Sequence, residues 1–207
     1  LAEATMGNIN IDNTNRTTTF TDLTLNTGYT FTLVPYTVFG VSGSTYTLTA
    51  YTIPVLYDYT VSNITTNSIQ LDVSGNFYYL SIVRSTLTNN TTINLSPGVT
   101  QLIDTGLISD LSYTYIITPY NADSNSSTVN YGKKFGNSIT TANFCTLPSI
   151  TGYSNTFTPY SITLNINGYY KYVTVQSSTG SFTQLSDRVS IYTETGLLQN
   201  TSYTYTL

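Results

Sequence analysis

One short motif returns along the chain and constrains its fold more than any other feature. A leucine stands six residues before a tyrosine in three places, as Leu23 and Tyr29, as Leu107 and Tyr113, and as Leu197 and Tyr203. Successive motif tyrosines are separated by 84 and by 90 residues. A repeat of this length matches one β-sandwich per unit and is too long for a solenoid unit.

Each motif tyrosine begins a segment in which apolar and polar residues alternate. These segments cover residues 29–36, 113–120 and 203–207. Alternation with a period of two residues predicts a β-strand that is buried on one face. The motif therefore marks the entry into the same strand of each unit.

A second set of segments repeats at a distance of 93 residues, at 68–75 and 161–168. Both alternate at period two, and an aromatic segment that we predict as a further strand follows each of them, at 77–83 and 169–175. The residues predicted to point into the core are Ile69, Leu71 and Val73 in the first segment and Ile162, Leu164 and Ile166 in the second.

The composition points to the same class of structure. Charged residues make up only 8% of the chain, whereas aromatic residues make up 14% and include 20 tyrosines. Aromatic and β-branched residues favour strands, and asparagine, glycine and serine favour turns. We therefore predict an all-β fold of tandem antiparallel β-sandwich modules.

The small number of cations argues against two classes of partner. The chain has six lysines and arginines and a net charge of −4. Contacts from cations to phosphates dominate nucleic-acid affinity, so we expect no binding to DNA or RNA. We also expect no membrane insertion, because no cluster resembles a polybasic patch and no apolar run approaches the roughly 18 residues of a spanning helix.

The leucine, the five residues after it and the strand-opening tyrosine resemble the signature between strands E and F of fibronectin type III modules. In that family the tyrosine hydroxyl bonds back to the upstream backbone, so the resemblance implies a structural corner at each motif. Residues 35–43 resemble the family's F–G loop. The family usually carries a tryptophan on strand B, where this chain has Val73 and Ile166. An immunoglobulin-like relative and a diverged viral version are therefore alternatives.

The repeat predicts three unequal modules. Residues 1–54 correspond to the later half of a module, residues 55–148 to a complete one, and residues 149–207 to a module that ends within strand F. Pro54 and Pro148 close the first two, because proline cannot continue a ladder. We expect a segment of a longer array. The alternative is that a neighbouring subunit donates the missing strands.

The ingredients of a catalytic or metal site are mostly missing from the sequence. The absence of histidine excludes Ser–His and Cys–His nucleophiles and histidine metal sites. Alternation predicts that Cys145 is a small core residue. Asp104 and Glu194 occupy equivalent repeat positions, which indicates a structural role at a strand end or turn. We predict no enzyme, no cofactor and no metal.

One loop is longer than its counterpart. Compared with the first module, about ten residues are inserted between Asn121 and Thr141 of the complete module. The candidate contact residues there are Tyr131, Lys133, Lys134 and Phe135, which include the only adjacent cations of the chain. Loops at the end of a sandwich often carry recognition, so we consider a contact with a protein subunit, a glycan or an acidic surface. A longer hairpin with a solvated tip is the alternative.

The weakly charged, tyrosine-rich surface suits contacts between protein subunits. We therefore expect a non-catalytic structural or surface-display protein in a homo- or hetero-oligomeric assembly. The expected setting is extracellular, on a cell surface or on a virion, as a fibre, spike or minor capsid component. An adhesion module that binds protein or glycan through its sandwich-end loops is the alternative function.

Overall fold

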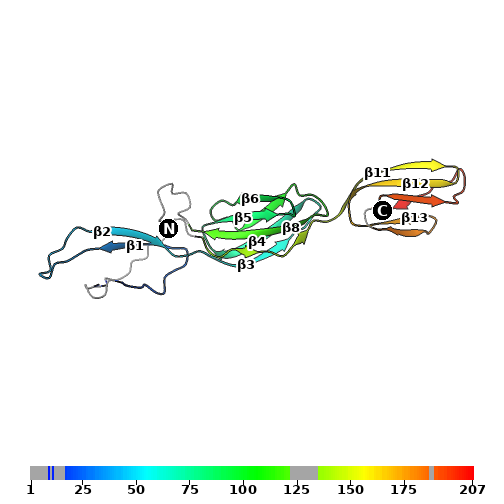
Figure 1. The fold of residues 1–207 in the computed structure, drawn as a ribbon. Coiled ribbons are helices and arrows are strands. Elements are labelled where there is room, and N and C mark those ends of the chain that lie inside the picture. The colour runs from blue at the N-terminus through cyan, green and yellow to red at the C-terminus, as the bar shows by residue number, and fades with distance from the viewer. Residues whose placement is uncertain (1–8, 10, 12–16, 122–134, 187–188) are drawn as a thin grey trace. The chain divides into compact units, whose positions relative to one another are not determined.

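The computed structural model describes residues 9, 11, 17–121, 135–186 and 189–207. The chain has an all-β fold with several antiparallel sheets (Figure 1). Within the described ranges, no helix is long and apolar enough to cross a bilayer.

Contacts divide the chain into two compact units. The first contains Leu1–Thr60, Leu71–Leu102 and Thr114–Ala142, and the second contains Val61–Gln70, Ile103–Tyr113 and Asn143–Leu207. The boundary between these two units cuts through four strands and therefore does not separate one sandwich from the next. The three modules expected from the sequence stay a prediction.

The first unit begins with a hairpin of two strands. Strand β1 (Gly28–Leu33) pairs antiparallel with β2 (Tyr46–Tyr51), and Phe31 lies opposite Leu48. The ring of Phe20 packs on that of Phe31 with 4.8 Å between centroids. The hairpin therefore carries an apolar cluster on one face.

The central part of the chain forms two antiparallel sheets. One has the order β3-β4-β7, and the other has the order β10-β8-β5-β6 with β9 also paired to β8. The strands are β3 (Val55–Ser62), β4 (Ser68–Asn76), β5 (Tyr79–Ser85), β6 (Asn90–Asn94), β7 (Gln101–Thr105), β8 (Ser112–Tyr120), β9 (Ile139–Thr140) and β10 (Phe144–Cys145).

The predicted inward residues of this part are confirmed. The exposed fractions of Ile69, Leu71 and Val73 on β4 are 0%, 0% and 6%. On the other sheet, Ile82 of β5 and Ile117 of β8 are fully buried and lie opposite each other. Burying such a side chain stabilises the fold by about 1.5–3 kcal/mol, so the alternating faces determine where the core lies.

Residues 149–207 form two three-stranded antiparallel sheets, of order β11-β12-β15 and β14-β13-β16. Their shared core contains Leu164, Ile166, Tyr170, Val173, Val175 and Tyr192, with Ile162 partly buried against it. The strands are β11 (Ser149–Thr158), β12 (Ser161–Tyr169), β13 (Val173–Ser177), β14 (Phe182–Leu185), β15 (Ile191–Thr195) and β16 (Tyr205–Thr206).

Two expectations differ from the structure. Cys145 is exposed, and the prediction of a core cysteine is wrong. The neighbouring Thr146 is buried instead, with 1% exposure, so the inward phase of this segment is shifted by one residue. The strand expected at 169–175 is interrupted: β12 ends at Tyr169, and the next strand, β13, begins at Val173. Between them, the buried Tyr170 donates its hydroxyl to the Ile166 carbonyl at 3.0 Å.

Candidate functional site

The three repeated tyrosines make the same hydrogen bond. In each case the hydroxyl oxygen accepts the backbone N–H five residues upstream. The bonds run from Thr24 to Tyr29 at 2.8 Å, from Ile108 to Tyr113 at 2.9 Å and from Leu198 to Tyr203 at 2.8 Å. The motif leucines Leu107 and Leu197 are buried, and the first motif leucine, Leu23, is half-buried.

A backbone feature that the sequence analysis missed accompanies each corner. The residue three before the tyrosine has a positive φ, at 51° in Asn26 and 55° in both Asp110 and Asn200. Asparagine and aspartate tolerate this left-handed conformation better than other non-glycine residues. The recurring Asn or Asp at this position was the sequence signal.

A threonine closes the first two corners. Thr52 donates its hydroxyl to the Thr24 carbonyl at 2.6 Å and accepts the Thr27 N–H at 2.9 Å, and its own N–H reaches the Thr27 carbonyl at 3.0 Å. We call this arrangement of three bonds a threonine clip. The clip ties the end of β2, which lies directly before Thr52, to the corner turn.

The second corner repeats the clip with Thr146. Its hydroxyl donates to the Ile108 carbonyl at 2.6 Å and accepts the Leu111 N–H at 3.2 Å, while its N–H donates to the Leu111 carbonyl at 3.1 Å. Thr146 is 1% exposed, so these bonds are shielded from water. Sequence reasoning missed the clips, although Thr52 and Thr146 each precede a proline by two residues.

The third corner has the same turn but no clip within the described residues. The equivalent groups are the Leu198 carbonyl and the N–H and carbonyl of Thr201, and no hydrogen bond from the described residues reaches them. Tyr203 is only half-buried, whereas Tyr29 and Tyr113 are 5% and 3% exposed. This corner is therefore open.

The sheet face beside the open corner is also uncovered. On β11, Tyr153 lies opposite Ile166 and Phe157 lies opposite Ile162, so both aromatic residues share the face that carries the core. Their exposed fractions are nevertheless 67% and 79%. The inner face of β11 thus presents two large aromatic side chains to solvent.

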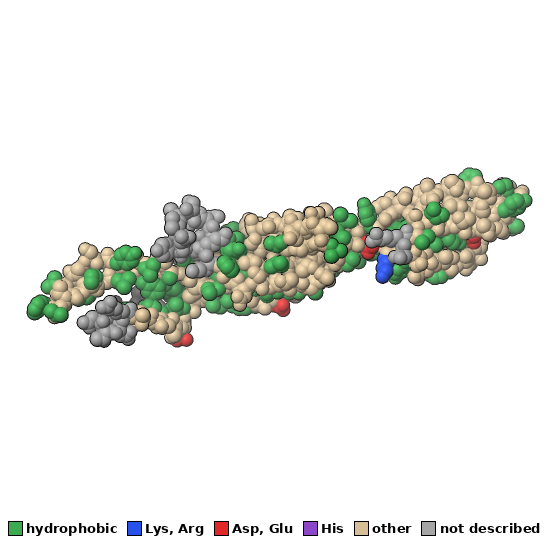
Figure 2. Space-filling model, viewed as in Figure 1, with side chains coloured by type: hydrophobic (Ala, Val, Ile, Leu, Met, Phe, Trp, Pro, Cys, Tyr) green, Lys and Arg blue, Asp and Glu red, His purple; other side chains and the backbone are tan. Residues whose placement is uncertain are grey.

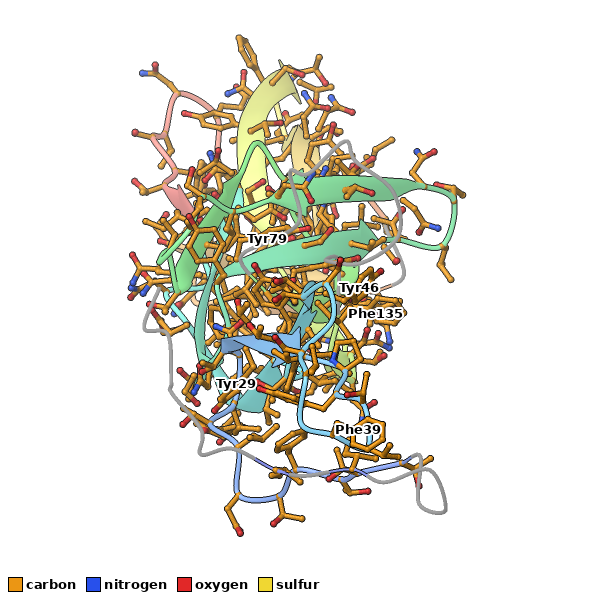
Figure 3. All side chains as sticks on the ribbon, turned by 90° about the vertical axis from the view of Figure 1, so that its left-hand side faces the viewer. Tyr29, Phe39, Tyr46, Tyr79 and Phe135 are labelled. Carbon is orange, nitrogen blue, oxygen red and sulfur yellow. The ribbon has the colours of Figure 1, made fainter. Side chains whose placement is uncertain are left out.

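A second apolar surface lies at the tip of the β1–β2 hairpin, where Figure 2 shows hydrophobic side chains gathered. Val38 and Phe39 are 95% and 91% exposed, and Val41 is 63% exposed. Backbone bonds from Thr37 to Val41 and from Gly40 to Thr37, both of 2.9 Å, hold the turn. Phe39 lies on the loop that joins β1 and β2, and Figure 3 labels it.

Of the four predicted contact-loop residues, Tyr131, Lys133 and Lys134 lie outside the described residues. Phe135 is 63% exposed, and its ring is tilted against that of Tyr120 with 6.1 Å between centroids. Tyr120 in turn stacks on Tyr79 at 4.7 Å. Three aromatic rings thus follow one another, on β5, on β8 and at Phe135, which forms an isolated bridge with Tyr120 (Figure 3 labels Tyr79 and Phe135).

The ionisable groups that the structure describes do not form a reactive constellation. No group of three or more metal-ligating side chains occurs in the described part of the chain. Asp104 is 5% exposed and Glu194 is half-buried, each at the penultimate position of its strand. Partial burial, and then the Asp110 carboxylate, raise the pKa of the Cys145 thiol, which disfavours the nucleophilic thiolate.

Hydroxyl groups surround the Glu194 carboxylate. Thr179 donates to its Oε1 at 2.6 Å. Burial alone would raise the pKa of Glu194, but the hydroxyls of Thr179, Ser177 and Tyr205 favour the charged form and leave the pKa below its usual value. Burial, and then Glu194, raise the pKa of Tyr205. This cluster stabilises a strand end and has no second carboxylate for acid–base catalysis.

Comparison with known proteins shows likeness in structure alone. No family model matches the chain, and no curated protein matches it in sequence. A segment of two fibronectin type III domains from chicken tenascin is similar with a TM-score of 0.51 and 16% identity, over 72% of this chain and 87% of that one. A computationally redesigned β-sandwich protein covers 46% of this chain and 94% of its own, with 18% identity and a TM-score of 0.36. The chain therefore has an all-β fold of antiparallel sheets with fibronectin type III domains among its structural neighbours.

Proposed function

We propose that this chain is a non-catalytic structural part of a protein assembly on an extracellular, cell or virion surface, as in a fibre, spike or minor capsid component. The fold favours a module without catalysis, since its structural neighbours include fibronectin type III domains. The weakly charged surface favours close contacts between subunits, because few charges must lose water when they are buried.

The observation that carries the proposal is the uncovered inner face of β11. Tyr153 and Phe157 are exposed although they lie in register with core residues of β12. Large tyrosine and phenylalanine side chains gain the most free energy when another protein surface removes them from water. This face is therefore the contact surface that we assign to a neighbouring subunit.

The test is native mass spectrometry of the full chain over a range of protein concentrations. We expect oligomers whose fraction rises with concentration and falls in the Phe157→Lys variant. Thr156→Lys is the matched control, since Thr156 is an exposed neighbour that points to the opposite face of β11. A chain that stays monomeric at every concentration, or a control that dissociates oligomers as strongly, would contradict this role for the face.

Adhesion through a sandwich-end loop is the second candidate, and the hairpin tip favours it. Val38, Phe39 and Val41 form an exposed apolar tip on a hydrogen-bonded turn. Such a tip suits insertion into an apolar pocket of a protein partner better than stacking with a glycan, because no polar side chain sits between the three residues. Phe39→Ser should lower attachment of the chain to target cells while the oligomer distribution stays the same. Unchanged attachment would remove this candidate.

A further inference from the structure

Strand β6 is an edge of the central sandwich that lacks the usual protection of an edge strand. It pairs with β5 and with no other strand of the described residues (Figure 1). Residues 86–96, which contain β6 and the turn before it, include neither a charged residue nor a proline. The edge strand β3 of the other central sheet, by contrast, carries the exposed Asp58. Charges and prolines keep further strands away from such edges, so β6 must be protected in another way.

The composition of this edge makes protection necessary. Thr91, Thr92 and Ile93 are consecutive β-branched residues, which favour strands. Leu87, in the turn between β5 and β6, is 99% exposed and adds apolar surface beside the edge. Uncharged segments of high strand propensity without proline are those that associate through their edges.

Three Asn-x-Ser/Thr triads lie in or beside β6, and they begin at Asn89, Asn90 and Asn94. Such a triad is the acceptor sequence for an N-linked glycan, which is bulky and solubilising. Triads are common in a chain this rich in asparagine, serine and threonine, so the sequence alone does not select among them. Their placement on an unprotected edge does.

The register of β6 selects Asn90 from these three. Ile93 lies opposite the fully buried Ile82, so the alternate residues Asn90, Thr92 and Asn94 lie on the outward face. Asn90 and Thr92 are both exposed, and they are the acceptor and the hydroxyl residue of one triad. Asn94 shares this face, but its triad runs past the end of β6.

Hydrogen bonds set two other triads apart. The Asn89 triad depends on the hydroxyl of Thr91, which accepts a hydrogen bond from Arg84 at 3.3 Å. The triad at Asn63 lies before β4, and the Asn63 Nδ2 atom, which would bear the sugar, donates to the Gln70 Oε1 atom at 2.8 Å. A glycan on Asn63 would displace this bond, whereas the exposed Asn90 accommodates one on the outward face.

We propose that Asn90 carries an N-linked glycan that shields the edge of β6. In the transfer, the Asn90 Nδ2 atom bonds to C1 of a sugar that is supplied as a glycosyl diphosphate. The bond between C1 and the diphosphate oxygen breaks, the diphosphate leaves, and the amide nitrogen loses one proton. This inference rests on the extracellular or surface setting of the proposed function, because the secretory pathway supplies the donor and the transferase.

Glycopeptide mass spectrometry of the full chain, isolated from its natural source, tests the assignment. We expect sugar on the peptide that contains Asn90 and none on the peptide that contains Asn63. Enzymatic removal of the glycan in heavy-oxygen water leaves a labelled aspartate and identifies the modified residue. An unmodified Asn90 would overturn the inference, including the case in which only Asn89 or Asn94 is modified.

Two variants of Thr92, produced in secretory eukaryotic cells, separate the glycan from the strand. Thr92→Ala removes the hydroxyl that the Asn90 triad requires, and Thr92→Ser is the matched control that keeps it. The glycan on Asn90 should be lost in the first variant and retained in the second. A glycan on Asn90 in both variants would contradict the role of this triad.

Light scattering of the same two variants tests the shielding. Both are measured in the Phe157→Lys background, so that contacts through β11 do not contribute. We expect the alanine variant to associate more strongly than the serine variant as the concentration rises, because its edge is uncovered. Equal association would overturn the shielding of β6.

The glycan and the proposed assembly fail independently. Oligomers that dissociate in Phe157→Lys, in a chain with unmodified Asn90, would support the assembly and overturn the glycan. A glycosylated Asn90 in a chain that stays monomeric at every concentration would do the reverse.

Discussion

Replacing Tyr113 by phenylalanine removes the hydroxyl that accepts the corner hydrogen bond from the Ile108 N–H. The ring remains, so no cavity forms, but the Ile108 N–H loses its acceptor at 2.9 Å. Tyr113 is 3% exposed, and water therefore has little access to the orphaned N–H. A buried donor left without a partner costs about 1–3 kcal/mol, which is the expected loss of stability.

Hydrogen exchange at Ile117 measures this loss. Ile117 is fully buried in β8, and its amide exchanges only when the strand opens. A loss of about 1–3 kcal/mol corresponds to a fall in protection of roughly 5- to 150-fold. Tyr203→Phe is the matched control, read at Val175, which is fully buried in β13. Its effect should stay below about 1 kcal/mol, because Tyr203 is half-buried and water replaces the lost acceptor.

The difference in cost between the two corners is expected to follow the access of solvent to each tyrosine hydroxyl. Equal falls in protection for the two variants would show that burial does not determine the cost. A fall of less than about twofold at Ile117 in Tyr113→Phe would show that the corner bond contributes little net stability.

Three further predictions concern packing and ionisation. Gly75→Ala should lower the free energy of unfolding in urea by about 1–3 kcal/mol, because the added Cβ would lie 2.4 Å from the Val55 carbonyl oxygen. Gly152→Ala is the control and should be neutral, because open space surrounds that position. Alkylation of Cys145 at mildly alkaline pH should be slower than that of a free thiol, because the pKa of Cys145 is raised. Alkylation should be faster in Asp110→Asn, since the Asp110 carboxylate contributes to the raised pKa. Equal rates in the unchanged chain and in Asp110→Asn would contradict this cause. The folded-state pKa of Glu194 is depressed, so its contribution to stability is present above the ordinary value of 4.5 and is lost as the pH falls through the folded pKa. Urea midpoints should therefore fall on acidification less in Glu194→Gln than in the unchanged chain.

Local patterns were sufficient to predict the strand class and much of the core. Alternation in β4 placed Ile69, Leu71 and Val73 inward, and they are buried. This succeeds because successive side chains of a strand point to opposite faces, so hydrophobicity alone assigns the face. The same rule gave the wrong phase for Cys145 in the two-residue strand β10, where a polar threonine occupies the buried position.

The sequence by itself determined the all-β class and the repeated Leu–Tyr motif, because strand alternation is a local property of the chain. Only the tertiary structure showed that Thr52 and Thr146 close two corners while the third is open, and that the inner face of β11 is exposed. A clip joins groups 28 or 38 residues apart in sequence, and the burial of a face depends on what packs against it. Neither property can be read from neighbouring residues, because both arise from contacts between distant segments.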